Sequence, residues 1–230
     1  MNTETLLNQR HLSVADIGSL QDVLNEKADK KNPDWRSART ANDFILAAGL
    51  ELAELIESAP WKWWKKAGET DWWNLKIEAI DMLHFMVSAL LINGLDEEQG
   101  RLALGYPKEQ NNLPGIFLNP HQPDFINREY SVELMKKVFA FDADASVIDE
   151  VMKSVGLQQD EISAIYVAKY TLNEIRWAGG YDDGTYQKMK ANGVEDNVFL
   201  KTVVDKFLAD ESLLLTDVSR LVRETMSELS

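Results

Sequence analysis

The sequence contains no cysteine among its 230 residues. A disulfide framework, a thiol nucleophile and a thiolate metal site are therefore excluded, and the absence suits a reducing compartment. No run of about 18 or more apolar residues occurs. The N-terminal stretch MNTETLLNQRHL lacks the basic segment and apolar run of a secretory signal. We therefore expect a cytoplasmic protein without a membrane partner.

Basic residues are also scarce. The chain has 24 Lys and Arg but 38 Asp and Glu, which gives a formal net charge of −14. Long-range repulsion then opposes binding to DNA, RNA or an anionic membrane. We expect no nucleic-acid partner. If the protein binds an anion, a cation is expected to mediate the contact.

Alternating patterns typical of strands are missing, whereas apolar residues recur at helical spacing. This spacing predicts helices over residues 11–28, 42–58, 73–93, 131–141, 145–155, 159–177, 195–208 and 216–228. Pro60 and Gly94 follow two of these ranges and are typical helix stops. With 45% hydrophobic residues the chain can bury a substantial core. The sequence therefore predicts an all-α helical bundle, with residues 1–230 as a single domain.

Proline is rare, yet four of the six prolines fall in the stretch GYPKEQNNLPGIFLNPHQPDF, residues 105–125. Proline and glycine in such a cluster favour irregular backbone. We expect an irregular, mobile insertion around residues 94–157.

Two predicted helices carry paired carboxylates. Glu51 and Glu54 are three residues apart, as are Glu78 and Asp81, and residues at this spacing are neighbours on one helix face. The helix with Glu78 and Asp81 is apolar around most of its circumference, which predicts that it is largely buried. Both pairs are thus expected to project from packed helices.

Four carboxylates that converge in a partly buried place repel one another, and a hard divalent cation with oxygen ligands relieves this repulsion. Mg²⁺ is the first candidate, because it also bridges to phosphate oxygens. The alternative is an ordinary solvated face, since E-x-x-E is frequent on exposed helices. An acidic stripe of that kind is typical of a non-enzymatic helical interaction protein with a basic partner.

Five of the seven tryptophans lie within residues 61–73, in the stretch that links the two acidic helices. Large rings bury large areas, so we expect most of them to pack this link and to hold the carboxylates relative to one another.

Several blocks together resemble a known family. ExxE at Glu51 and Glu54, followed after 23 residues by ExxD at Glu78 and Asp81, is similar to the all-α NTP pyrophosphatase superfamily. Six further blocks resemble the dimeric dUTPases of kinetoplastids, some bacteria and phages: LQDVLN at 20–25, NPDW at 32–35, PWKWWK at 60–65, NLKIEAIDMLHF at 74–85, KYTLNEIR at 169–176, and GYDDGTYQKM with EDN within 180–197. They span most of the chain in the family's order.

The resemblance implies an obligate homodimer that hydrolyses dUTP, and also dUDP, to dUMP with release of pyrophosphate or phosphate, by attack on the β-phosphorus. It implies two or three Mg²⁺ ions, which Mn²⁺ can replace, bound by Glu51, Glu54, Glu78 and Asp81. Glu51 would also orient or deprotonate the attacking water.

The resemblance also implies the substrate site. Uracil would lie near Gln21 and Asn25, whose amides offer a donor and an acceptor. Trp63 would form a stacking wall, His84 would stand near the base, and Phe85 would press on the sugar.

The phosphates would meet a row of side chains on one helix face, Lys169, Asn173 and Arg176, which are spaced i, i+4 and i+7. A glycine-rich loop beyond them would close over the phosphates and bring in Tyr186, Lys188 and Asn197.

A related all-α pyrophosphatase that acts on dCTP or other nucleotides, including a MazG-like enzyme, is the alternative within the superfamily. Its members often open the first motif with two glutamates, whereas Leu50 precedes Glu51 in this chain. That difference argues against a MazG-like enzyme.

Overall fold

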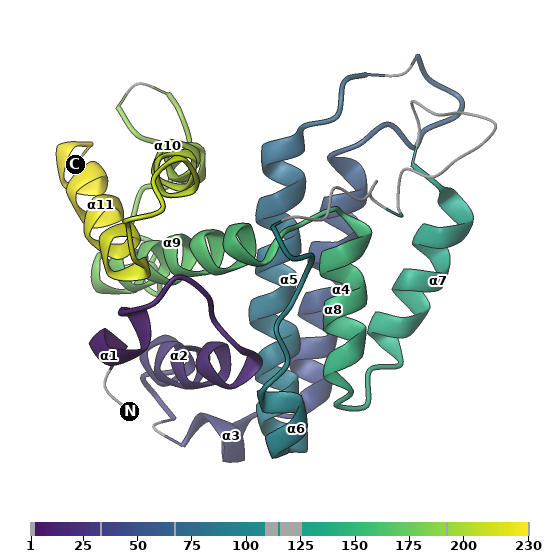
Figure 1. Cartoon of the computed structure of the whole chain (residues 1–230), viewed down its shortest axis with the longest axis horizontal. Coiled ribbons are helices and arrows are strands. Elements are labelled where there is room, and N and C mark those ends of the chain that lie inside the picture. The colour runs from purple at the N-terminus through teal and green to yellow at the C-terminus, as the bar shows by residue number, and fades with distance from the viewer. Residues whose placement is uncertain are drawn as a thin grey trace.

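The protein is described by a computed structural model that covers residues 3–32, 34–66, 68–108, 115, 126–191 and 193–229. Across these residues the chain forms eleven helices and isolated β-bridges but no extended strand (Figure 1). The predicted all-α fold class is confirmed. No helix in these ranges is long and apolar enough to cross a membrane.

The helices are α1 Thr3–Leu7, α2 Val14–Ala28, α3 Trp35–Ala38, α4 Ala41–Glu57, α5 Trp72–Asn93, α6 Glu97–Gly100, α7 Arg128–Phe139, α8 Ala145–Ser154, α9 Gln159–Ala178, α10 Asp196–Ala209 and α11 Leu215–Glu228. All eight predicted helices are confirmed, with ends shifted by three residues or fewer. The helices α1, α3 and α6 were not predicted, because four or five residues are too few to show a period.

Capping side chains explain where the helices begin. The helix α2 starts at Val14 rather than residue 11, because the side chains and backbone N–H groups of Ser13 and Asp16 form a capping box. The Asp71 carboxylate accepts the Asn74 N–H at 2.9 Å and begins α5. Gly94 ends α5 with a φ of +112°, a conformation that costs glycine little.

The long helix α5 lies at the centre of the molecule (Figure 1). It packs against α4, and α7 and α8 cover this pair on one side. On the other side α5 contacts α2 and α9, and α10 and α11 pack on α9. Apolar residues at both faces of α5 are fully buried, including Leu75, Ile80 and Leu90. Two groups of helices therefore share one central helix, and side chains of α5 lie between them.

The segment around residues 94–157 contains α6, α7 and α8. Leu134, Val138, Ile148 and Met152 of α7 and α8 belong to the same hydrophobic core as α4 and α5. The proline-rich part of the predicted insertion, residues 109–125 apart from Gly115, lies outside the described residues.

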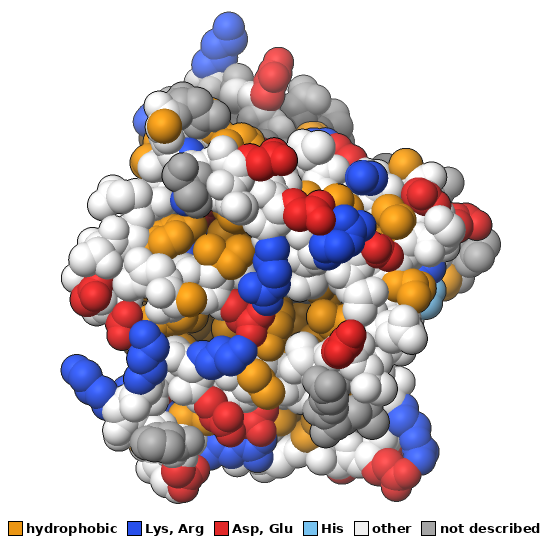
Figure 2. All heavy atoms as spheres, turned by 90° about the vertical axis from the view of Figure 1, so that its left-hand side faces the viewer, with side chains coloured by type: hydrophobic (Ala, Val, Ile, Leu, Met, Phe, Trp, Pro, Cys, Tyr) orange, Lys and Arg blue, Asp and Glu red, His pale blue; other side chains and the backbone are white. Residues whose placement is uncertain are grey.

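Charged side chains of both signs are interspersed on the face seen from the left-hand side of Figure 1, as Figure 2 shows. Exposed pairs such as Arg220 with Glu224, at 2.9 Å, contribute about 0–1 kcal/mol each to stability. The apolar contacts among α9, α10 and α11 therefore hold this part of the fold together.

Candidate active site

A cleft of about 260 Å³ opens where α2, α5 and α9 meet. The helix α4 and the loop after α9 also contribute to its wall. The cleft is lined by Gln21, Leu24, Asn25, Ala28, Glu51, Asp81, His84, Phe85, Lys169, Asn173, Arg176, Trp177, Tyr181 and Lys188. Ten of the fifteen residues predicted for the site are in this set.

Three carboxylates gather beside the cleft, where α4 packs on α5. Glu51, Glu54 and Glu78, which we call the acidic cluster, each offer an oxygen within 4.8 Å of the others. Oxygens bound to one Mg²⁺ ion at about 2.1 Å lie at most about 4.2 Å apart. Small side-chain rotations therefore suffice for these three residues to hold a divalent metal ion, and their hard oxygen donors suit it.

Two carboxyl groups of the acidic cluster, Glu51 and Glu78, have raised pKa values. Burial raises the pKa of the Glu51 carboxyl to about 8, and the nearby charges of Asp81, Glu78 and Glu54 add to the shift. Burial, together with the charges of Asp81 and Glu54, also raises the pKa of Glu78. Like charges disfavour joint ionisation, whereas a bound cation favours it. The cluster thus has the electrostatics expected of a metal site.

Asp81, the fourth predicted ligand, lies outside the acidic cluster. Its carboxylate is 2.9 Å from the ammonium of Lys169, whose side chain is only 2% exposed. This ion pair crosses the cleft from α5 to α9. The structure therefore places three predicted ligands together and the fourth on the cleft wall, paired with a cation.

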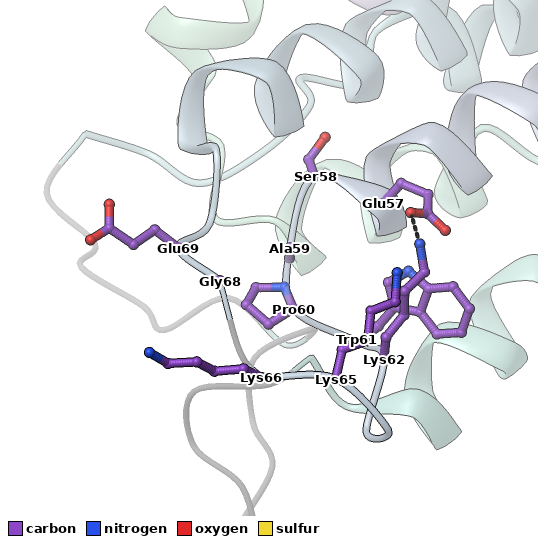
Figure 3. Close-up of a pocket in the computed structure, with 10 residues that line it drawn as sticks. All are labelled: Glu57, Ser58, Ala59, Pro60, Trp61, Lys62, Lys65, Lys66, Gly68 and Glu69. Atoms are coloured by element: carbon purple, nitrogen blue, oxygen red, sulfur yellow. Dashed lines mark hydrogen bonds and ion pairs between the residues drawn. The ribbon is translucent and has the colours of Figure 1, made fainter.

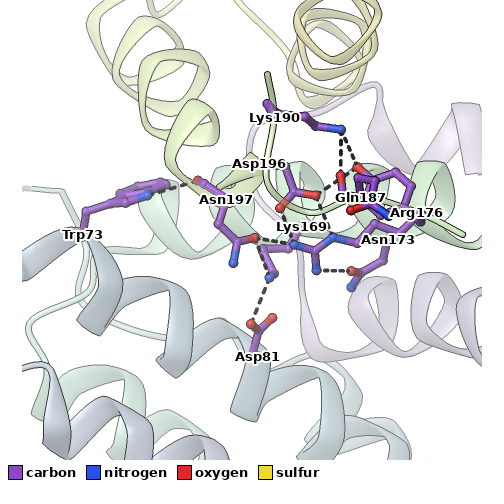
Figure 4. A network of polar contacts seen from close by, with 10 residues as sticks. Trp73, Asp81, Lys169, Asn173, Arg176, Gln187, Lys190, Asp196 and Asn197 are labelled. Atoms are coloured by element: carbon purple, nitrogen blue, oxygen red, sulfur yellow. Dashed lines mark hydrogen bonds and ion pairs between the residues drawn. The ribbon is translucent and has the colours of Figure 1, made fainter. Parts of the chain in front are cut away.

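The predicted row of donors on α9 shares one face, as the spacing indicated, and Figure 4 shows its contacts. The guanidinium of Arg176 donates to the Asp196 carboxylate from Nε at 3.1 Å and from Nη2 at 2.6 Å. Lys169 and Arg176 also donate to Oδ1 of Asn197, each at 3.1 Å. Asn197 therefore does not line the cleft, and its side-chain oxygen bridges the Lys169 ammonium and the Arg176 guanidinium.

Asp196 was not predicted as a site residue, although it is fully buried. Asp196 stands in the first turn of α10, where an acidic residue commonly stabilises the helix dipole. That position explains the residue type without its ion pair to Arg176, so the sequence did not single it out. Burial opposes its ionisation, but the hydrogen bonds and charge of Arg176 outweigh burial and lower the pKa of Asp196. Tyr186 donates its hydroxyl to the same carboxylate at 2.9 Å. Tyr186 thus closes the network behind the cleft and does not line it.

Two aromatic residues of the cleft were also missed. Trp177 and Tyr181 pack edge to face with ring centroids 5.2 Å apart, and both line the cleft. The ammonium of Lys188 lies 5.4 Å from the centroid of the Tyr181 ring, within the range of a cation–π contact. The loop after α9 is therefore already folded against the cleft.

The tryptophan-rich link departs from the prediction. Trp61 and Trp73 pack against the core, but Trp63, Trp64 and Trp72 are 66%, 55% and 50% exposed. The prediction that most of these rings pack the link is therefore wrong. The residues at the end of α4 instead leave a separate hollow of about 180 Å³, lined by Trp61 and three lysines (Figure 3). Trp63, the predicted stacking residue, does not line the cleft.

The all-α fold places a carboxylate cluster beside a cleft whose wall carries two buried cations, Lys169 and Arg176. Such a set of groups is typical of an enzyme that acts on a phosphorylated ligand. A family model described as dUTPase matches residues 13–181, which include every residue lining the cleft except Lys188. The chain therefore belongs to the dUTPase family, and it is an enzyme, a dUTP diphosphatase. No curated protein matches the sequence.

The family assignment decides between the alternatives. A non-enzymatic interaction protein with an acidic stripe is the wrong interpretation of the two carboxylate pairs. Enzymes of this family generally depend on a divalent metal ion, which agrees with the acidic cluster. The match also favours dUTP over the dCTP alternative.

Proposed function

We propose that the enzyme hydrolyses dUTP, and also dUDP, to dUMP in this cleft with Mg²⁺ as its metal. The single observation that carries the proposal is the position of Glu51, which belongs to the acidic cluster and also lines the cleft. Metal and substrate would therefore meet at this carboxylate. The four residues that would hold two or three ions, replaceable by Mn²⁺, are Glu51, Glu54, Glu78 and Asp81.

A bound divalent ion supplies charge that polarises phosphate oxygens and makes a water more acidic. Glu51 can orient that water and accept its proton, because its carboxylate faces both the acidic cluster and the cleft. Glu54 and Glu78 complete the acidic cluster and do not line the cleft. The extensive packing of α4 against α5 keeps these groups in a fixed relation.

The donors on α9 would bind the phosphates. Lys169, Asn173 and Arg176 line one wall, and charge-assisted hydrogen bonds from such groups to phosphate oxygens are strong. Lys188 would add a further cation from the loop after α9. Asn197 and Tyr186 would act from behind, through their contacts with Arg176 and Asp196.

The base would lie at the opposite end, near Gln21, Asn25 and His84, with Phe85 against the sugar. All four residues line the cleft. Stacking by Trp63 stays a prediction. Its exposed ring would have to reach the base after a rearrangement of the link, or enter the cleft of a second chain.

Nucleotide hydrolysis tests the proposal directly. With Mg²⁺ we expect the enzyme, as residues 1–230, to release dUMP from dUTP and from dUDP, to act poorly on dCTP, dTTP and UTP, and to lose activity in EDTA. Product release can be followed by chromatography. Undiminished activity in EDTA would remove the metal from the proposal, and equal turnover of dCTP and dUTP would remove the uracil site.

We further propose that the enzyme is a homodimer joined through the exposed apolar face of α4 and α7. This α4–α7 face consists of Leu46 and Leu50, which are 59% and 58% exposed, and Val132 and Phe139, which are 49% and 50% exposed. A groove of about 370 Å³ with an almost wholly apolar lining, including Ile126 and Val132, adjoins the face. Contiguous apolar patches of this kind mark association sites on soluble proteins.

Sedimentation of a charged variant tests the dimer. We expect the wild-type protein to sediment as a dimer at micromolar concentration and Leu46→Lys to sediment as a monomer, because a buried lysine without a partner opposes association. Val198→Lys is the matched control, since Val198 is 50% exposed on α10, away from this face. A fully active wild-type monomer, or a dimeric Leu46→Lys variant, would contradict the proposed interface.

A further inference from the structure

Five polar side chains from three helices form one series of hydrogen bonds at the end of the cleft where Gln21 and Asn25 lie. We call Tyr166, Gln21, Asn25, Ser88 and His84 the amide chain. The Tyr166 hydroxyl lies 3.0 Å from Oε1 of Gln21, Nε2 of Gln21 lies 2.9 Å from Oδ1 of Asn25, and Nδ2 of Asn25 lies 3.0 Å from Oγ of Ser88. Tyr166 and Ser88 are fully buried and do not line the cleft.

The direction of these hydrogen bonds is set at Ser88. Its Oγ lies 2.8 Å from the backbone carbonyl oxygen of His84, which can only accept, so the hydroxyl donates there. Oγ then accepts from the Asn25 amide nitrogen. If the hydrogen bonds ran in the opposite direction, Ser88 would donate to Asn25. Oγ of Ser88 and the carbonyl oxygen of His84 would then lie 2.8 Å apart with no proton between them. The amide oxygen of Asn25 is therefore turned to the nitrogen of Gln21.

The same direction carries through Gln21 to the histidine ring. Oε1 of Gln21 accepts from the Tyr166 hydroxyl and lies 2.6 Å from Nδ1 of His84. Because an amide oxygen cannot donate, Nδ1 carries the proton. Burial lowers the pKa of His84 to about 4, so the ring is neutral at pH 7 and holds one proton only.

The other ring nitrogen of His84, Nε2, is then unprotonated and can only accept a hydrogen bond. Nε2 of His84 is buried and has no hydrogen-bond partner in the described part of the chain, although the ring belongs to the cleft wall. The ring stacks on Tyr166 with centroids 4.4 Å apart, which limits its rotation. A ligand in the cleft that offers an N–H can supply the missing partner, whereas one that offers a lone pair cannot.

We infer that the amide chain holds His84 as the Nδ1–H tautomer, that Nε2 accepts a hydrogen bond from the imide N–H of uracil, and that Tyr166 and Ser88 are the positioning residues. This inference rests on the proposed function and deepens it. Cytosine has a bare nitrogen where uracil carries N3–H, so it meets a second lone pair at Nε2. Sites built to pair a ligand group reject analogues that lack it.

The tautomer can be measured without any activity. The chain has three histidines, so His11→Gln with His121→Gln leaves His84 as the only imidazole. Long-range ¹H–¹⁵N correlation spectra of this variant at pH 7 should show Nδ1 of His84 protonated and Nε2 unprotonated. Addition of dUMP should shift the Nε2 resonance as expected for an accepted hydrogen bond, and dCMP should not. Protonation at Nε2 in the free protein overturns the inference.

Substitutions in the amide chain supply the second test. Ser88→Ala removes the group that sets the direction, and Tyr166→Phe removes a donor to Gln21 with little change of volume. In Ser88→Ala we expect the other tautomer to appear, and in both variants we expect the dUTP-to-dCTP ratio of kcat/KM to fall roughly tenfold or more. Ser154→Ala and Tyr170→Phe are matched controls, because both hydroxyls belong to buried residues whose hydrogen bonds lie outside the amide chain.

The outcomes separate this inference from the proposed function. Hydrolysis of dUTP with an unchanged dUTP-to-dCTP ratio in Ser88→Ala overturns the inference and leaves the function in place. A protein that holds the Nδ1–H tautomer but does not hydrolyse dUTP overturns the function, and with it the role assigned to Nε2 at the base.

Discussion

Glu78→Gln is expected to lower kcat/KM for dUTP by at least about 1,000-fold while the fold is retained. Glu78 is 8% exposed and belongs to the acidic cluster, and glutamine keeps its shape but removes its charge. Metal-assisted charge stabilisation supplies several kcal/mol in such reactions, and each 1.4 kcal/mol is about tenfold in rate. Glu57→Gln is the control, because Glu57 is an exposed carboxylate at the end of α4 and lies outside the acidic cluster. Turnover within tenfold of wild type in Glu78→Gln would exclude the acidic cluster from the reaction.

The same variant should change how stability depends on pH in EDTA. The pKa of Glu51 is about 8 in the folded protein, against 4.5 for an unperturbed glutamate. Between these values the folded protein binds more protons than the unfolded chain, so the free energy of unfolding falls as pH rises through this window. Glu78→Gln removes one of the charges that raise the Glu51 pKa. Urea unfolding at pH 5, 7 and 9 should therefore show a smaller decline for Glu78→Gln than for the wild type.

Asp196→Ala is expected to destabilise the protein by about 3–5 kcal/mol, because it leaves the buried guanidinium of Arg176 without its carboxylate. Arg176 would also lose the orientation that directs it along the cleft wall, and a misplacement of about 1 Å can cost about 100-fold in rate. Unfolding in urea and kcat/KM for dUTP measure the two effects. Asp205→Ala is the control, since Asp205 pairs with Lys201 on the exposed face of the same helix.

A second substitution distinguishes a lost ion pair from a general loss of packing. If the unpaired charge is the cause, Arg176→Met combined with Asp196→Ala should recover part of the stability without recovering activity. The lowered pKa of Asp196 adds a pH signature. Its contribution to stability is present above the unfolded pKa of about 3.8 and is lost as pH falls through the lower folded value, and both variants should lack this acid-dependent loss. An Asp196→Ala variant as stable as the wild type would contradict the role of the pair.

Much of the local architecture could be predicted because it depends on residues close in sequence. Helical spacing located α2, α4, α5 and the helices from α7 to α11, and spacing also showed that Lys169, Asn173 and Arg176 share a face. Side chains three, four or seven residues apart on one helix are neighbours whatever the rest of the chain does. The pairing of Glu51 with Glu54 follows from the same geometry.

Contacts between side chains of different helices could not be predicted from residue spacing. Asp81 ended beside Lys169 and outside the acidic cluster, because α9 packs on α5 and brings an ammonium to its carboxylate. Asp196 looked like an ordinary acidic residue at a helix start until the fold buried it against Arg176. Trp64 and Trp72 looked like packing residues, yet the link that holds them runs over the surface and leaves both rings exposed.

The sequence by itself thus determined the helical class, the carboxylate pairs and the row of donors, since each follows from periodicity along a single helix. Tertiary structure alone decided which of these groups meet, which charges are paired and which are buried. The acidic cluster, the Asp196–Arg176 pair and the amide chain all join residues from different helices. Their chemistry arises because packing removes these groups from water and sets their neighbours, and neither effect is contained in the spacing of residues along one helix.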